Sequence, residues 1–594
     1  MTDSTRRLLA GLLCLSFLLA PIAIAADTGA PSDLSGLWQA KRRFGPDLRG
    51  PISIVRSGND WRAEIGGRTA DCNASAGSVA CDFGPSRGRL RLTIDAHQSI
   101  TYAWWLQPPS IFGSHETPVP LSKFSAAEWR GTVTPLEDRV TIYLPLAATP
   151  VAGSYATYLR NPERNVGVFL NVSRLAVAGD TVTLYAQRDP KAGETALASG
   201  HYDRDRDAFS FYLQRFDETF DFQRVKAGEP SDFYPRGFRT AKYRYQPPPA
   251  RDDGWPVSTL EEQGMDRARI EAFIQKVIDT PMDSVHASDI HGVLIARHGR
   301  LVLEEYFHGV SRDQLHDMRS ASKSFTSVLA GAVIERKLSD FGVDTPVYAA
   351  MQPRVPTGAV EPREQAMKVE HLLTMSAGFF CDDSNDDAPG NEDKMQEQPA
   401  EPDWYRYTLV VPMATDPGAE SVYCSSQPNL LGGVIGAKTG RPLADLFREL
   451  VADPLGMKHY SLFVQPTGEP YMGGGVQVEA RDFLKFAQLM LNQGTWQGHR
   501  IVSKEWSQRS TSSVVRLRGS GYGYLWWIGE YDYHGRKLAA YFAGGNGGQV
   551  SLGVPELDLA ITFLGGNYSD RVLFVPQREY VPNEILPAVS DPAG

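Results

Sequence analysis

Ser320 and Lys323 are the residues whose types and spacing most directly suggest chemistry. A serine hydroxyl is a weak nucleophile at neutral pH unless a base lies within hydrogen-bonding reach. Residues three positions apart lie on the same face of a helix, so this spacing places the lysine amine beside the serine hydroxyl. The pair therefore predicts nucleophilic catalysis by serine. Because Ser-x-x-Lys is common in long chains, the prediction depends on the surrounding sequence.

The segments on either side of the pair predict the start of a helix. Two β-rich runs, 292–297 and 301–306, precede it and are separated by a short turn, which is typical of a hairpin. From Phe325 onward apolar residues recur at helical spacing, so Ser320 and Lys323 are expected at the N-terminus of a helix with one buried face. The free amides and partial positive charge of such an end stabilise a developing oxyanion.

Two later segments complete a recognisable set of motifs. Tyr423 and Ser425 form a Tyr-x-Ser pattern between a tight turn and a helix, and Gly545 and Asn546 lie where a glycine-rich strand begins. In this order, the three motifs resemble those of the serine β-lactamase and penicillin-recognising superfamily. Within it, the chain most resembles class C β-lactamase-like esterases and 6-aminohexanoate-oligomer hydrolases, over residues 255–590. Further matching phrases lie at 371–378, 480–491, 521–527 and 554–558.

The resemblance implies a fold and a role for each motif residue. It implies an antiparallel sheet flanked by helices, with a helical lobe and a site between the lobes. Ser320 would be the acylated nucleophile, while Lys323 and Tyr423 would share the general-base and general-acid work. Both side chains have ordinary pKa values of about 10, so we expect their packing around one hydroxyl to shift them into use at neutral pH. The amides of Ser320 and Asn546, the residue after Gly545, would form the oxyanion hole.

Two departures from the family pattern narrow the expected substrate. Ala543 stands where many β-lactamases and D-Ala carboxypeptidases have lysine or histidine, so a cation for a substrate carboxylate is missing there unless another loop supplies one. Ser425 replaces a common asparagine; its hydroxyl can bind a substrate carbonyl but cannot give and accept as an amide does. We therefore expect a small neutral ester or amide substrate, cleaved through an acyl-enzyme on Ser320.

Two other functions stay open at this point. One is hydrolysis of β-lactams or D-Ala-D-Ala peptides by the same fold. The other, from a different class, is a non-catalytic sensor that resembles penicillin-binding proteins. The joint presence of Ser320, Lys323 and Tyr423 argues against the sensor, because a binding module has no use for all three.

The first residues of the chain predict export. Arg6 and Arg7, the apolar run 8–24 and the small residues around position 25 are typical of a secretory signal peptide, so we expect a signal peptide at 1–25 and a periplasmic or secreted protein. No later apolar run is long enough to span a bilayer. The net charge of −10 disfavours binding to nucleic acid, which is also negatively charged. No zinc-type histidine pair or nucleotide loop occurs, so no metal or cofactor is expected.

The length of 594 residues predicts more than one domain. Residues 26–240 show strand-like alternation, frequent turn residues and almost no helical period, which predicts an antiparallel β-sandwich or barrel. We expect a proline-rich linker at 241–256 and the β-lactamase-related hydrolase domain at 257–594.

The cysteine count agrees with export. Loss of Cys14 with the signal peptide leaves four cysteines, an even number in an oxidising compartment. Three pairings are possible, and the alternative is that all four thiols are free. We expect Cys72 to pair with Cys81 across a short turn. We expect Cys381 to pair with Cys424, which would tie the acidic loop of residues 382–393 to the second motif.

Overall fold

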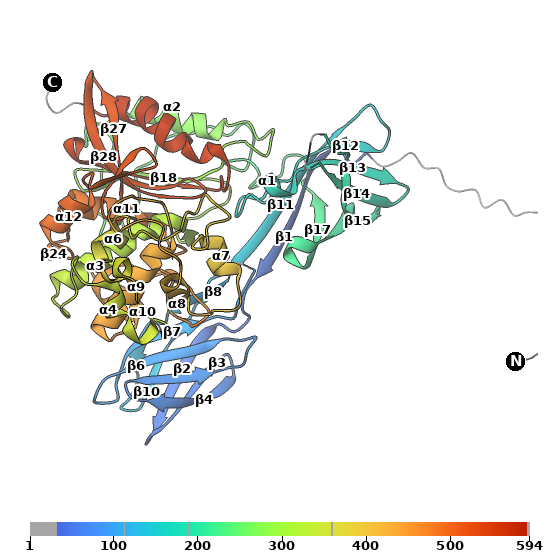
Figure 1. The fold of residues 1–594 in the computed structure, drawn as a ribbon. Helices are drawn as coiled ribbons and strands as arrows, with labels where there is room; N and C mark the ends of the chain where they lie inside the picture. The colour runs from blue at the N-terminus through green and yellow to red at the C-terminus, as the bar shows by residue number, and fades with distance from the viewer. Residues whose placement is uncertain (1–32, 112, 188, 190, 358–359, 591–594) are drawn as a thin grey trace, which may run out of the picture.

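A computed structural model describes residues 33–590, apart from positions 112, 188, 190 and 358–359. The predicted signal peptide at 1–25 lies outside the described residues. Within them, strands form a closed barrel, a twelve-stranded sheet, an eight-stranded sheet and a two-stranded sheet. Figure 1 shows the barrel to one side, strands β2–β7 and β10 below, and the helices gathered around the remaining strands. No helix among the described residues combines the length and apolar character needed to cross a bilayer.

The barrel is made of eight antiparallel strands and lies at the right of Figure 1. Buried and more exposed positions alternate along its strands, because successive side chains point to opposite faces of a sheet. Bulky aromatic side chains fill the interior, among them Trp38, Phe209 and Phe222. The strands are β1 (Gly36–Phe44), β11 (Asp138–Ala148), β12 (Ser154–Ala156), β13 (Val172–Ala178), β14 (Thr181–Ala186), β15 (Thr195–Asp203), β16 (Ala208–Leu213) and β17 (Glu218–Arg224).

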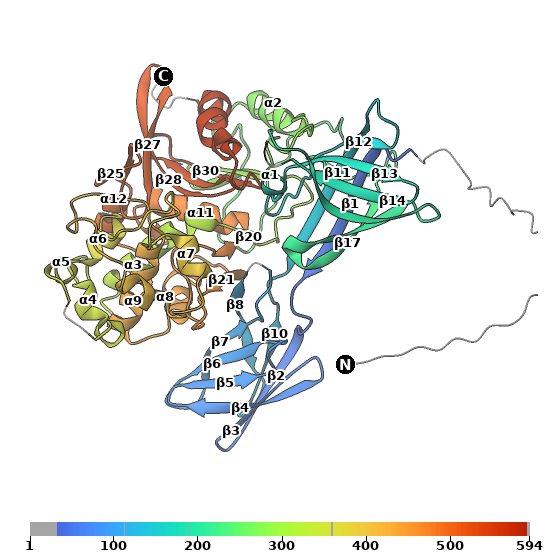
Figure 2. The ribbon, with the colours of Figure 1, turned by 45° about the vertical axis from the view of Figure 1, so that its right-hand side comes forward.

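The twelve-stranded sheet joins the two halves of the chain. Strand β8 pairs antiparallel with β21, with Glu116 opposite Leu462, so strands far apart in sequence lie side by side (Figure 2). At the end of this sheet, β20 stops three residues before Ser320. Its strands are β2 (Gly50–Ser57), β3 (Asp60–Ile65), β4 (Arg68–Ser75), β5 (Ser78–Asp82), β6 (Arg89–Ile94), β7 (Ile100–Leu106), β8 (Ser114–Pro118), β9 (Leu121–Lys123), β10 (Glu128–Val133), β20 (His316–Asp317), β21 (Tyr460–Val464) and β22 (Gln477–Val478).

The predicted all-β, antiparallel character of the N-terminal region is confirmed. Its strands divide between the barrel and the larger sheet. The predicted pairing of Cys72 with Cys81 is also found, and it links two neighbouring strands at directly opposite positions.

The C-terminal part, residues 257–590, contains an antiparallel sheet and most of the helices. The sheet strands in spatial order are β19 (Arg300–Tyr306), β18 (Ile290–Arg297), β30 (Leu559–Gly565), β29 (Gln549–Val554), β28 (Arg536–Gly545), β27 (Trp527–Tyr533), β26 (Ser520–Tyr522) and β25 (Val515–Leu517). A small pair is formed by β23 (Thr495–Trp496) and β24 (His499–Arg500). The α-helices of the described residues are α1 (Gly167–Leu170), α2 (Arg267–Ile278), α3 (Ser322–Glu335), α4 (Val347–Ala350), α5 (Pro362–Gln365), α6 (Val369–Leu373), α7 (Glu392–Glu397), α8 (Trp404–Leu409), α9 (Ser426–Thr439), α10 (Leu443–Phe447), α11 (Ala480–Leu491) and α12 (Lys504–Ser510).

Helices cover both faces of the eight-stranded sheet. All residues of β18 are buried, and alternate ones belong to different cores. Val293 and Ile295 pack in the core that includes α2, whereas Leu294 and Ala296 pack in the larger core that includes α3, α9 and α11. The predicted antiparallel sheet with flanking helices and a helical lobe is thereby confirmed.

The predicted linker at 241–256 follows an irregular path and is packed against the C-terminal part. Tyr245 and Trp255 are buried. The Tyr245 hydroxyl donates to the Val302 carbonyl over 2.8 Å, and the Trp255 indole nitrogen donates to the Arg481 carbonyl over 3.0 Å. These bonds hold the segment in place.

Candidate active site

Ser320 and Lys323 lie together at the start of α3, as the spacing predicts. Ser320 belongs to a 3-10 turn, Arg319–Ala321, that leads directly into the helix. The Lys323 Nζ donates a hydrogen bond to the Ser320 Oγ over 2.9 Å and a second to the Gly473 carbonyl over 2.6 Å. Lys323 is 2% exposed, whereas Ser320 is only half-buried. The pair thus combines a buried amine with a serine that is not fully buried.

The pKa of Lys323 moves in the opposite direction from the one expected. Burial alone lowers the pKa of the ammonium, but the Tyr423 hydroxyl and the carboxylates of Glu392 and Asp383 outweigh it, so the pKa is raised above its ordinary value. Lys323 is therefore a cation at neutral pH. The direction of this shift does not favour Lys323 as a free base, and its predicted share in proton transfer stays a prediction.

Tyr423 lies over the amine of Lys323 and against a tryptophan. Its ring centroid is 5.0 Å from the Lys323 Nζ, and the ring stacks on Trp527 with centroids 5.8 Å apart. The Arg518 guanidinium lies 4.5 Å from the same ring centroid. The structure therefore brings Tyr423 to the Ser320–Lys323 pair and places two cationic side chains near its ring.

The acidic loop holds the second motif in place. The predicted disulfide between Cys381 and Cys424 is present. Beside it, the Asp383 amide donates to the Tyr423 carbonyl over 3.0 Å, and the Asp383 carboxylate accepts from the Ser425 amide over 2.8 Å and from its hydroxyl over 2.6 Å. Ser425 is fully buried, and its hydroxyl is bonded to Asp383 of the acidic loop. The geometry gives no support to its predicted contact with substrate.

The sequence motifs did not identify Asp383 and Glu392 as site residues. The predicted Cys381–Cys424 disulfide could have indicated Asp383, because Asp383 lies two residues after Cys381. Burial raises the pKa of Asp383 to about 6, with a further contribution from the nearby Glu392 carboxylate. Glu392 in turn accepts a 2.6 Å hydrogen bond from the Tyr471 hydroxyl. Two carboxyl groups therefore act electrostatically on the buried ammonium of Lys323, which favours its charged form.

The third motif lies against the turn that carries Ser320. Gly545 ends β28, and a Cβ atom at this position would lie 2.3 Å from the Met318 carbonyl oxygen. Only glycine permits this close approach of the two backbones. Asn546 follows and is exposed, and its side-chain oxygen accepts a 2.8 Å bond from the Ser569 amide. Ala543 is fully buried, so a longer side chain there would have to displace neighbouring core residues.

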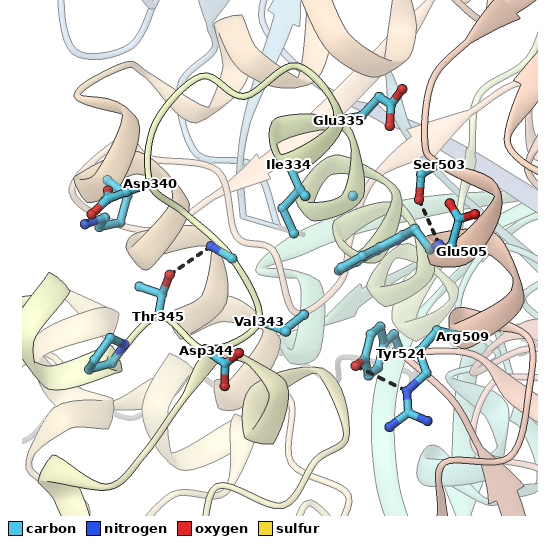
Figure 3. Close-up of a pocket in the computed structure, with 15 residues that line it drawn as sticks. Ile334, Glu335, Asp340, Val343, Asp344, Thr345, Ser503, Glu505, Arg509 and Tyr524 are labelled. Atoms are coloured by element: carbon cyan, nitrogen blue, oxygen red, sulfur yellow. Dashed lines mark hydrogen bonds and ion pairs between the residues drawn. The ribbon is translucent and has the colours of Figure 1, made fainter.

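A separate cavity lies at the other end of α3. It has a volume of about 640 Å³ and is lined by the C-terminal residues of the helix, such as Ile334, together with Thr345, Ser503, Arg509 and Tyr524 (Figure 3). Neither Ser320 nor Tyr423 lines it.

Among the described residues, no group of three or more histidine, cysteine or acidic side chains is arranged to hold a metal ion.

Comparison with known proteins identifies the family. The chain is similar to a 6-aminohexanoate-dimer hydrolase of Paenarthrobacter ureafaciens, with 25% identity over 271 residues, covering 43% of this chain and 64% of that protein. The match therefore spans less than two thirds of the relative. Among solved structures, the chain is similar to EstCE1, a hydrolase with promiscuous acyltransferase activity (TM-score 0.41, 20% identity, 51% of this chain and 95% of that one). It is also similar to a penicillin-binding protein of Bacillus halodurans (TM-score 0.38, 17% identity, 49% of this chain and 96% of that one). A family model described as Beta-lactamase matches residues 267–565, half of the chain, and the protein belongs to this family.

Proposed function

We propose that this protein is an exported serine hydrolase that cleaves neutral esters or small amides through an acyl-enzyme on Ser320. The observation that carries the proposal is the 2.9 Å hydrogen bond between Lys323 and the Ser320 hydroxyl at the start of α3. Membership of the β-lactamase family and similarity to a relative named as a hydrolase support catalysis. A sensor would gain nothing from a serine hydroxyl held by a buried lysine in this way.

Because Lys323 is charged, Lys323 and Tyr423 have different roles in the proposed reaction. As an ammonium, Lys323 cannot accept the Ser320 proton, but its positive charge lies beside both the Ser320 Oγ and the Tyr423 ring. We therefore assign proton transfer to Tyr423 and electrostatic support to Lys323. This division replaces the shared role expected from the sequence.

The proposed reaction has two balanced halves. In the first, the Tyr423 phenolate takes the proton of Ser320 as its Oγ attacks the acyl carbon, and Tyr423 then returns the proton to the departing alcohol or amine. In the second, Tyr423 takes a proton from water, which attacks the acyl-enzyme, and gives it back to Ser320 Oγ as the acid leaves. The amides of Ser320 and Asn546 would stabilise both tetrahedral oxyanions, each by about 3 kcal/mol.

The substrate class follows from the third motif and from the relative. Ala543 offers no cation, and desolvating an unpaired substrate carboxylate is costly, so neutral acyl groups are favoured. The name of the matched relative, 6-aminohexanoate-dimer hydrolase, supports hydrolysis of a linear amide, but that dimer carries an ammonium and a carboxylate, so the preference for a neutral substrate rests on Ala543 alone. The predicted signal peptide and the two disulfides support an oxidising, exported location.

One observation favours the alternative of β-lactam or D-Ala-D-Ala peptide hydrolysis. The Arg518 guanidinium lies near the Tyr423 ring, its side chain is 47% exposed, and its nearest carboxylate contact, to Asp382, is a long 4.0 Å. A cation at this place is able to receive the substrate carboxylate that Ala543 cannot. Arg518 is therefore the residue that separates the two substrate classes.

Covalent labelling tests the proposal. The purified protein is treated with a fluorophosphonate and its intact mass is measured, with Ser320→Ala as the matched control. We expect one adduct on the parent protein and none on Ser320→Ala. Hydrolysis of a short p-nitrophenyl ester should exceed that of nitrocefin in kcat/KM by at least about a hundredfold, since loss of a charged partner costs several kcal/mol. Full ester hydrolysis by Ser320→Ala would refute the assignment of the nucleophile.

A further inference from the structure

The loop of residues 160–165 leaves the barrel and contacts the C-terminal part beside the proposed oxyanion hole. It runs between β12 and α1, and α1 lies between the barrel and the eight-stranded sheet in both views (Figures 1 and 2). The two amides proposed to hold the oxyanion belong to different elements. One is on the turn before α3 and the other follows β28.

On the Ser320 side, the loop acts through a buried ion pair. The Arg164 Nη1 donates to the Asp317 Oδ2 over 2.6 Å, and the two side chains are 12% and 10% exposed. The other oxygen of Asp317 accepts the Arg319 amide over 2.8 Å. Arg319 has a φ of 48°, in the left-handed region that is costly for a residue with a side chain. The ion pair thus supports a strained residue immediately before Ser320.

On the Asn546 side, the loop contacts the backbone of the segment that follows β30. The Asn165 side-chain amide donates to the Tyr568 carbonyl over 3.0 Å. The next residue, Ser569, donates its amide to the Asn546 side chain over 2.8 Å. The loop lies tightly here, because a Cβ atom on Gly566 would be 2.4 Å from the Pro162 carbonyl oxygen.

A second buried ion pair anchors the same loop. The Arg160 Nη2 lies 3.1 Å from the Asp289 Oδ1, and the side chains are 3% and 6% exposed. The Asp289 amide donates to the Asn567 side chain over 2.7 Å, and the Asn567 amide donates to the Gly547 carbonyl over 3.0 Å. Gly547 is the residue after Asn546, so this chain of contacts also ends at the third motif.

We propose that the 160–165 loop sets the relative position of the Ser320 and Asn546 segments, with Arg164 and Asn165 as positioning residues for the oxyanion hole. The inference rests on the proposed function. Oxyanion stabilisation depends on donors held close to their final geometry before reaction. Because this loop from the N-terminal region contacts both segments, it holds their relative position, which neither segment holds by itself. This gives the β-rich N-terminal region a part in the chemistry without contact with substrate.

The experiment compares two loop variants with a matched control. Arg164→Gln removes the ion pair to Asp317, and Asn165→Gly removes the side-chain amide while keeping a residue suited to its φ of 48°. The control is Arg174→Gln, which breaks an ion pair of 2.7 Å with Glu194 within the barrel. Initial rates with a p-nitrophenyl ester are divided by the concentration of Ser320 that a fluorophosphonate titrates.

We expect kcat per titrated site to fall at least about tenfold in both loop variants, with KM changed less than about twofold, because the donors act in the transition state. The inhibition constant of a boronic acid that bonds to Ser320 should weaken by a similar factor. Arg174→Gln should match the parent protein in all three quantities.

The possible failures are distinguishable. An unlabelled parent protein would refute the proposed function itself. A labelled parent whose loop variants keep kcat per site would overturn the positioning role alone. Variants that lose only thermal stability or titratable sites, with kcat per remaining site unchanged, would also overturn it. If Arg164→Gln does not fold, Asn165→Gly decides the result by the same criteria.

Discussion

Removing the Cys381–Cys424 disulfide should lower both stability and catalysis, whereas removing Cys72–Cys81 should lower stability alone. The first pair closes a loop of 43 residues and the second a loop of 9. In the chain-entropy model these loops correspond to about 4 and about 2.6 kcal/mol at 25 °C. The two double Cys→Ser variants therefore form a matched pair: each removes one disulfide, and the disulfides lie in different parts of the fold.

The catalytic difference follows from the contacts beside the first disulfide. Cys381 is two residues before Asp383, whose amide and carboxylate bind Tyr423 and Ser425. Loss of the disulfide frees this loop and with it the position of the Tyr423 ring. The Cys72–Cys81 pair instead joins β4 to β5 in the N-terminal sheet.

Urea unfolding and steady-state ester hydrolysis measure the two effects. We expect kcat to fall at least about tenfold in the Cys381→Ser/Cys424→Ser variant, as for a misplaced proton-transfer group, and to stay within about twofold in the Cys72→Ser/Cys81→Ser variant. Equal kcat values for the two variants would refute the claim that the acidic loop positions Tyr423. An unchanged free energy of unfolding in both would refute the assignment of structural disulfides.

Three further predictions concern single side chains. Tyr423→Phe should lower kcat about a hundredfold or more with little change in KM, and an unchanged kcat would remove Tyr423 from proton transfer. The pKa of Asp383 is raised to about 6 in the folded protein. Its contribution to the free energy of unfolding is therefore fully present below the pKa of the unfolded state and is lost as the pH rises through 6. Asp383→Asn should therefore gain up to about 3 kcal/mol of unfolding free energy over the parent at pH 8 and nothing at pH 4, and urea melts at both pH values check this. Arg518→Ala should lower kcat/KM for nitrocefin at least about tenfold more than for a p-nitrophenyl ester; an equal effect would show that Arg518 does not bind the substrate carboxylate.

Local patterns were sufficient to predict several elements of this protein. The hairpin of β18 and β19 follows from two β-rich runs separated by a short turn, and α3 follows from the apolar period after Phe325. Both depend on residues close together in the chain, where side-chain periodicity reports directly on burial. The two cysteine pairs were also expected, because an even number of cysteines leaves few pairings.

The sequence by itself therefore determined the family, the motif order and the residues that meet at the start of α3. Only the tertiary structure decided that the pKa of Lys323 is raised, because Asp383 and Glu392, some sixty residues away in the chain, act on it electrostatically. It also decided the pairing of β8 with β21 and the contact of Arg164 with Asp317. Register between distant strands and pKa values both depend on which groups share a buried volume, and no local period encodes that.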